Sequence, residues 1–192
     1  MLDWLFSNFI EFFAVLTGFI AIFFQIKANV IYWPISIVNV ITYCIVFFQA
    51  KLYAEITLQL YYLVMSIYGW ILWLRKSPTN EKLNISKSSI KLLLTLLLVF
   101  FPLWLIMAFL LKKYTNTDVP YIDSFITSLS YIATYLLARK KIENWLLWIF
   151  IDFISIGLYY YKGLYLTIIL FLALTILAIV GYFKWKKHLY AS

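Results

Sequence analysis

The stretch Glu143–Tyr161, ENWLLWIFIDFISIGLYYY, combines a long apolar run with one polar face. Read as a helix, its three- and four-residue steps place one stripe of side chains together: Trp145, Trp148, Asp152, Ser155 and Tyr159. If the helix begins near Ile142, Asp152 lies roughly 15 Å along it, near the middle of a hydrocarbon layer about 30 Å thick. An acid at that depth costs on the order of 3 kcal/mol, so we expect it to face protein or a water-filled cavity. The stretch therefore predicts a membrane-spanning helix that lines a polar passage.

The composition agrees with an integral membrane protein. Hydrophobic residues make up 65% of the chain and charged residues only 12%, and the mean hydropathy is +0.92. The 192 residues leave room for roughly seven spans of about 20 residues each, and for no soluble domain. The net charge of +8 does not indicate nucleic acid, because the basic residues gather in short loops between apolar segments.

The sequence gives only weak support to the rival class of an intramembrane enzyme, and it disfavours a metal site. Cys44 is the only cysteine and His188 the only histidine, so neither a disulfide framework nor a thiolate metal site can form within one chain. Asp152 has no second deep acid as a partner, and no HExxH or P-loop pattern occurs. We therefore expect no enzyme, no metal and no cofactor. A sensor or assembly subunit without transport remains an alternative class.

Charges and turn residues divide the chain into seven apolar segments. They cover about 8–26, 30–49, 53–74, 88–111, 119–138, 142–161 and 163–183. Six or eight helices remain the alternative, since the last two segments meet at a tight turn. Twelve of the sixteen Lys and Arg residues fall in alternate connections, which predicts an outer N-terminus and a cytoplasmic C-terminus. The start of the chain carries acids rather than a basic region, so we expect its first segment to remain as a span.

The chain also contains an internal repeat. An ungapped shift of 112 residues aligns Trp33 with Trp145, Gly69 with Gly181, and Trp73 with Trp185. The repeat divides a single transmembrane domain, 1–192, into repeat one (about 8–74), a linking helix (about 88–111) and repeat two (about 119–187). One linking helix makes both triplets run in the same direction, a 3+1+3 arrangement of parallel repeats. The predicted fold class is thus an all-α membrane protein with seven transmembrane helices.

Polar stripes on four helices predict a substrate site near the bilayer midplane. The candidate binding residues are Ser36, Asn39, Tyr43, Gln59, Tyr62, Thr134, Trp145, Trp148, Asp152 and Ser155. Single Ser and Thr residues in spans more often serve packing or bond to the backbone. Aromatic residues near span ends usually form the interfacial belt, which is our expectation for Trp4, Trp73, Trp185 and Tyr190.

Aromatic faces around one buried acid suit a flat, cationic small molecule, because both attract positive charge where water is excluded. The amides of Asn39 and Gln59 add directional donors and acceptors. The sequence thus predicts a carrier for a cationic small molecule, with the lipid bilayer as its environment and no nucleic acid as partner.

Several motifs resemble the PnuC family of bacterial vitamin transporters, whose best-known members take up nicotinamide riboside. They are LYAEITLQ (52–59), IYGWILW (67–73), ENWLLW (143–148) and GLYL (163–166), and the resemblance covers about 15–187. It implies a seven-helix 3+1+3 fold and facilitated diffusion across the bacterial inner membrane, with a cytoplasmic kinase that traps the product. It also implies that Trp145, Trp148, Asn39 and Gln59 line the substrate cavity.

One departure from the family pattern concerns the substrate. Asp152 stands where a riboside-transporting member has Asn, and sister branches of the family carry thiamine or riboflavin. An acid would favour the thiazolium of thiamine, but nicotinamide riboside is also cationic, so both remain candidates. A homo-oligomer would fit the small size of the chain.

Overall fold

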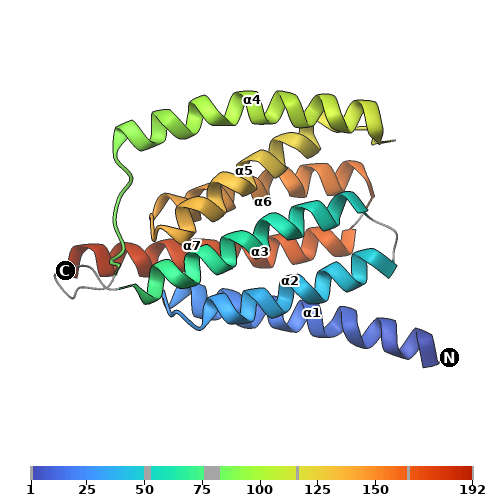
Figure 1. Cartoon of the computed structure of the whole chain (residues 1–192), viewed down its shortest axis with the longest axis horizontal. Coiled ribbons are helices and arrows are strands. Elements are labelled where there is room, and N and C mark those ends of the chain that lie inside the picture. The colour runs from blue at the N-terminus through green and yellow to red at the C-terminus, as the bar shows by residue number, and fades with distance from the viewer. Residues whose placement is uncertain (1, 50–52, 76–82, 116, 164, 192) are drawn as a thin grey trace. The chain divides into compact units, whose positions relative to one another are not determined.

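A computed structural model describes residues 2–49, 53–75, 83–115, 117–163 and 165–191. These residues form seven α-helices and no strand (Figure 1). The helices are α1 (Leu2–Ile26), α2 (Tyr32–Gln49), α3 (Tyr53–Leu74), α4 (Ile90–Tyr114), α5 (Pro120–Ala138), α6 (Glu143–Tyr161) and α7 (Tyr165–Ala191). The predicted all-α class and the helix number are confirmed.

The predicted boundaries differ most at the two ends of the chain. α1 begins at Leu2 and α7 continues to Ala191, beyond the predicted limit at residue 183. The sequence prediction ended at the lysines because charge marks the edge of the membrane. Lysine is a good helix former, so the helix itself continues past that edge.

The helices belong to two compact units. Unit 1 contains α1–α3 together with residues 138–140, and unit 2 contains residues 85–137 and 141–192, which include α4 and nearly all of α5–α7. Within unit 1, α2 packs against both α1 and α3, and within unit 2, α6 packs against α7. The core of unit 2 joins α4, α5 and α6 through Phe100, Leu129, Ile132, Ala133, Leu136 and Ile151.

The turns that precede α2 and α6 have the same local geometry. Ala28 and Lys140 lie 112 residues apart and are the described non-glycine residues with positive φ, at 50° and 49°. In each turn the next amide donates to a carbonyl five residues earlier: Asn29 to Phe24 at 3.0 Å, and Lys141 to Leu136 at 2.8 Å. Such six-to-one bonds satisfy the carbonyls at a helix C-terminus. The sequence repeat therefore extends to the backbone.

Each unit also contains a cluster of two tryptophans and a glycine. In unit 1, Trp33 is fully buried, and its ring centroid lies 5.2 Å from that of Trp73. A Cβ added to Gly69 would lie 2.6 Å from Cε2 of Trp33 and closer still to Cζ2, so only glycine fits beside this ring. The aligned cluster of unit 2 consists of Trp145, Gly181 and Trp185, with ring centroids 5.5 Å apart.

These clusters correct the predicted interfacial belt. Trp73 is 4% exposed and Trp185 is fully buried, so neither belongs to a belt. Trp73 also donates its indole N–H to the carbonyl of Ala138 at 2.9 Å. Tyr190 is 69% exposed, as the belt prediction requires, and the side chain of Trp4 lies outside the described residues.

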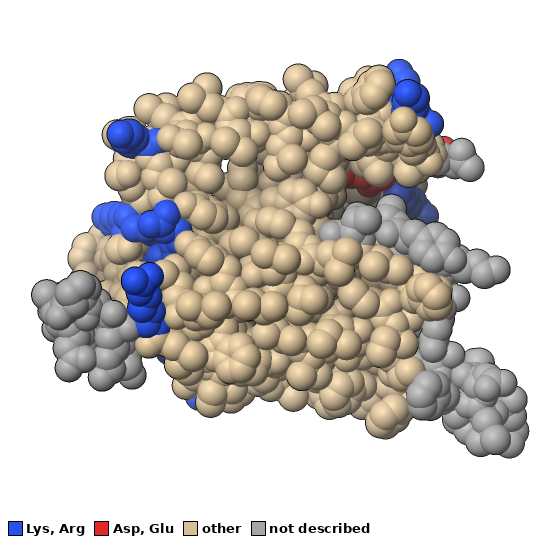
Figure 2. Space-filling model, in the orientation of Figure 1, with Lys and Arg blue, Asp and Glu red and all other residues tan. Residues whose placement is uncertain are grey.

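The surface of α4 is suited to lipid. Only Phe100 and Ala108 are buried in this helix, whereas large apolar side chains such as Leu94, Leu98 and Phe109 are exposed. Figure 2 shows basic side chains at both ends of α4 and uncharged surface between them. By length and composition, two stretches of the described chain could cross a membrane, Ile90–Tyr114 and Thr167–Tyr190. Exposed apolar surface on this scale marks contact with a membrane or a partner.

Candidate functional site

The polar stripe predicted on α6 faces the interior of the protein. Trp145, Asp152 and Ser155 are 2%, 4% and 1% exposed, whereas Phe153, on another face of the same helix, is 72% exposed. The helical period thus places the acid on a buried face of α6 and Phe153 on an exposed face, while the apolar Ile151 and Leu158 are also buried.

Asp152 of α6 lies near a second polar residue, Thr175 of α7. The Thr175 hydroxyl donates to the carbonyl of Phe171 at 2.8 Å, so it presents its oxygen lone pairs to other groups. A buried carboxyl group beside a hydroxyl group can take part in binding a polar or cationic ligand.

The two tryptophans of the ENWLLW motif have different surroundings. Trp145 packs on Gly181 and Trp185, and its buried indole N–H has no acceptor among the described residues. Trp148 is half-buried and packs against the apolar core that α5 and α4 contribute to unit 2. Of the two rings, Trp148 is the more accessible to a ligand.

Thr134 of α5 is buried, and its hydroxyl donates to the carbonyl of Ser130 at 2.8 Å, within the same helix. Thr127 and Ser130 bond in the same way to carbonyls one turn earlier. Such bonds satisfy the hydroxyl proton and leave the oxygen as an acceptor.

In unit 1, Asn39 joins α2 to α1. Its amide nitrogen donates to the carbonyl of Ala14 at 2.6 Å and to the hydroxyl of Thr17 at 3.0 Å. A ligand that met Asn39 in this arrangement would find the amide oxygen, which accepts hydrogen bonds. Ser36 joins α2 to α3, since its hydroxyl lies 3.0 Å from that of Ser66.

The remaining candidates of unit 1 lie on α2 and α3. Tyr43 stacks on Phe47, with ring centroids 5.5 Å apart, and Tyr62 lies edge-on to Tyr61 at 6.0 Å. Gln59 is half-buried and has no hydrogen-bond partner among the residues that the structure describes. Five predicted site residues therefore belong to unit 1 and five to unit 2. That they share one centre remains a prediction.

Sequence reasoning missed Glu143 at the start of α6. Its carboxylate accepts the Ser88 backbone N–H at 3.0 and 3.1 Å and the Ser88 hydroxyl at 2.7 Å. Lys141 donates to the Ser86 hydroxyl at 2.8 Å, and the Ile142 amide to the Ser86 carbonyl at 3.1 Å. These bonds fasten the segment before α4 to the turn before α6. The acid in the ENWLLW motif was the available signal, but its partner is 55 residues away.

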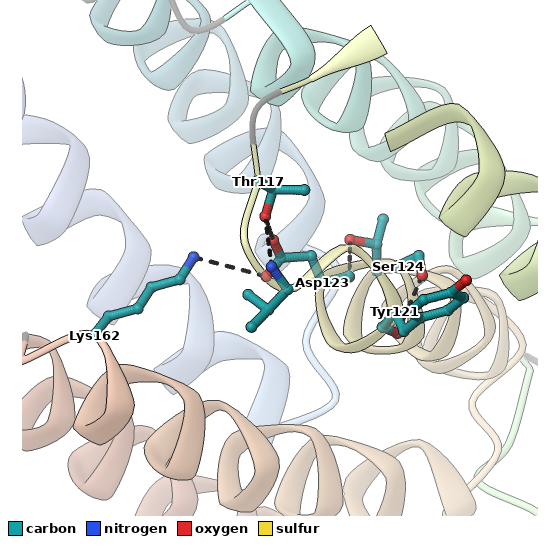
Figure 3. Close-up of polar contacts among 7 residues, drawn as sticks. Thr117, Tyr121, Asp123, Ser124 and Lys162 are labelled. Atoms are coloured by element: carbon teal, nitrogen blue, oxygen red, sulfur yellow. Dashed lines mark hydrogen bonds and ion pairs between the residues drawn. The ribbon is translucent and has the colours of Figure 1, made fainter. Parts of the chain in front are cut away.

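The opposite end of α6 carries a looser polar contact (Figure 3). Asp123 of α5 accepts the Thr117 hydroxyl at 2.6 Å, and its other oxygen lies 4.0 Å from the ammonium group of Lys162. Both charged side chains are about one-third exposed, at 27% and 35%, so water screens the pair. This contact orders the loop before α5 and adds little stability.

Comparisons with known proteins bear on the function of this arrangement. The sequence matches the family described as "Nicotinamide mononucleotide transporter" over residues 8–187. It is 29% identical over 175 residues to proteins named "Nicotinamide riboside transporter PnuC" from Escherichia coli (strain K12) and Shigella flexneri. Each alignment covers 78% of this chain and 73% of the relative.

A solved structure supports the fold. The chain matches one described as "Crystal structure of the Vitamin B3 transporter PnuC" with a TM-score of 0.75 and 19% sequence identity. The match covers 96% of this chain and 83% of that chain.

Proposed function

Because the chain belongs to the nicotinamide mononucleotide transporter family, and is thus a transporter rather than an enzyme, we propose that it carries nicotinamide riboside across the bacterial cytoplasmic membrane. The names of its relatives support this substrate. The observation that carries the proposal is Asp152, a buried acid beside Thr175 on a helix rich in aromatic residues. A permanently charged pyridinium ring is a flat cation of the kind that such a site attracts.

The proposed mechanism is facilitated diffusion by rocking of two three-helix bundles, α1–α3 and α5–α7, around a midplane site. The repeated turns at Ala28 and Lys140 and the repeated tryptophan–glycine clusters support two similar bundles joined by α4. A tightly packed cluster favours movement of each bundle as one body, since close-packed interiors deform little. The chain would work as a single domain, with the N-terminus outside and the C-terminus in the cytoplasm.

In this proposal the ten candidate residues line one cavity. Asp152 balances the charge of the pyridinium ring, and Trp148 offers it an aromatic face. Gln59 and the amide oxygen of Asn39 bind the ribose hydroxyls. Passive transport needs a sink on the inner side, so a cytoplasmic kinase would trap the product by phosphorylation. The working unit would be a homo-oligomer.

Thiamine is the second candidate substrate, and riboflavin a weaker third. The observation that favours thiamine is the acid itself, because the thiazolium ring is cationic, whereas riboflavin is neutral and gains nothing from Asp152.

Calorimetric titration of the purified protein with the three vitamins tests these assignments. We expect nicotinamide riboside to bind most tightly, and Asp152→Asn and Trp148→Ala each to weaken it by about tenfold or more. Phe153→Ala is the matched control, since this side chain lies next to Asp152 in sequence but is 72% exposed. If thiamine binds most tightly, the proposed substrate is wrong. If both site variants bind the vitamin with unchanged affinity, the proposed site is wrong.

A further inference from the structure

Unit 2 has a strongly basic end, formed by Lys87, Lys91, Lys141, Lys184, Lys186 and Lys187. Lys87, Lys91 and Lys187 are exposed, and the other three are half-buried. They come from three places in the sequence: the segment before α4 with the first turn of that helix, the turn before α6, and the last turns of α7.

Contacts hold these three places together. Lys141 donates to the Ser86 hydroxyl at 2.8 Å and to the carbonyl of Lys87 at 3.2 Å. The ammonium group of Lys87 lies 5.6 Å from the ring centroid of Tyr190, near the end of α7. The basic end is therefore one surface of unit 2.

Within the described residues, the lysines of this surface outnumber its acids. Glu143 is the acid at this end of the described chain, and its carboxylate is already engaged by three hydrogen bonds from Ser88. The ion pair between Lys162 and Asp123 lies at the opposite end of α6, so it does not offset this charge. The six lysines thus leave an excess of positive charge that an anion from outside the chain can balance.

An apolar wall begins beside these lysines. Ser89 caps α4 by accepting the amide of Leu92 at 3.2 Å, and Lys91 lies in the first turn. Further along α4, Leu94, Leu98 and Phe101 are 56%, 75% and 49% exposed. A cationic end next to an exposed apolar helix matches a ligand with a negative head and hydrocarbon tails.

We propose that the basic end of unit 2 binds the headgroup of an anionic phospholipid, whose acyl chains lie along α4. The lysines attract the phosphodiester, and the Ser86 and Ser89 side chains add polar contacts at the same boundary. Tyr190, 69% exposed beside Lys87, is suited to the same interfacial depth. This site is separate from the substrate site and does not depend on which vitamin is carried.

The test compares two charge-matched double variants at the ends of α4. Lys87→Gln with Lys91→Gln alters the basic end, and Lys112→Gln with Lys113→Gln removes the same charge at the other end of the helix. Binding of phosphatidylglycerol and of phosphatidylcholine is measured for each purified protein by native mass spectrometry and by thermal stabilisation. Lys187→Gln, on an exposed position of α7, serves if the first double variant does not fold.

We expect the unaltered protein to prefer phosphatidylglycerol. Each lysine near an anionic surface contributes roughly fivefold in affinity, so the first double variant should lose on the order of twentyfold and the second little. Equal losses in both double variants, or no preference between the lipids, would overturn the proposal. Equal stabilisation by millimolar inorganic phosphate would also overturn it, since the site would then bind phosphate without the tails.

Discussion

Replacement of Gly181 by alanine tests the tryptophan–glycine cluster of unit 2. A Cβ at this position would lie 2.6 Å from both Cζ2 and Cη2 of Trp145. Carbon atoms normally approach to about 3.5 Å, so the ring must move by roughly 1 Å. The ring has little room, because Trp145 is 2% exposed and Trp185 lies edge-on to it at 5.5 Å. Overpacking of this kind costs about 1–3 kcal/mol.

The control for this variant is Gly157→Ala on α6. A Cβ at Gly157 would meet nothing within 4 Å, so the change should be neutral or stabilising by up to about 1 kcal/mol through helix propensity. Gly69→Ala should behave like Gly181→Ala, since its Cβ would meet Trp33. The assay is denaturant unfolding in detergent, followed by tryptophan fluorescence. If Gly181→Ala is as stable as Gly157→Ala, the packing argument is wrong.

Three further predictions concern polar contacts, each measured by the same unfolding assay. Glu143→Gln should cost about 1–3 kcal/mol because it weakens charge-assisted bonds from Ser88, and an effect no larger than that of an exposed glutamine substitution would contradict this. Asn39→Leu should lower the free energy of unfolding by about 1–2 kcal/mol. A double-mutant cycle with Thr17→Ala should show coupling between the two residues. Strictly additive effects would argue against the hydrogen bond between α2 and α1. Asp123→Asn should lower the free energy of unfolding by less than about 1 kcal/mol, and by still less in high salt. A larger loss that does not depend on salt would contradict the view that water screens this ion pair.

The helices could be predicted from the sequence because charged or turn-forming residues bound each apolar segment. The inward stripe of α6 could be predicted for a similar reason, since the helical period sorts Asp152 and Ser155 away from Phe153. The sequence repeat also has a structural basis. It places a positive-φ residue at both 28 and 140, although neither is glycine and nothing local predicts that backbone.

Other features depend on contacts that no local pattern encodes. Trp73 was assigned to the interfacial belt because a tryptophan near a span end has the same sequence context whether it faces lipid or packs beside a glycine. Both sequence repeats contain a tryptophan and a glycine at the same spacing. This recurrence was the better indication that the tryptophans pack inside the protein. Thr175 was missed because it is a lone polar residue on an otherwise apolar part of α7, and only tertiary packing brings it to Asp152.

The most direct test of the central claim is counterflow in proteoliposomes without ATP and without an ion gradient. Liposomes preloaded with unlabelled nicotinamide riboside should take up the labelled compound transiently above equilibrium, and Asp152→Asn should slow this uptake while Phe153→Ala should not. Binding of the vitamin without counterflow would contradict the account, since it would make the protein a sensor rather than a carrier.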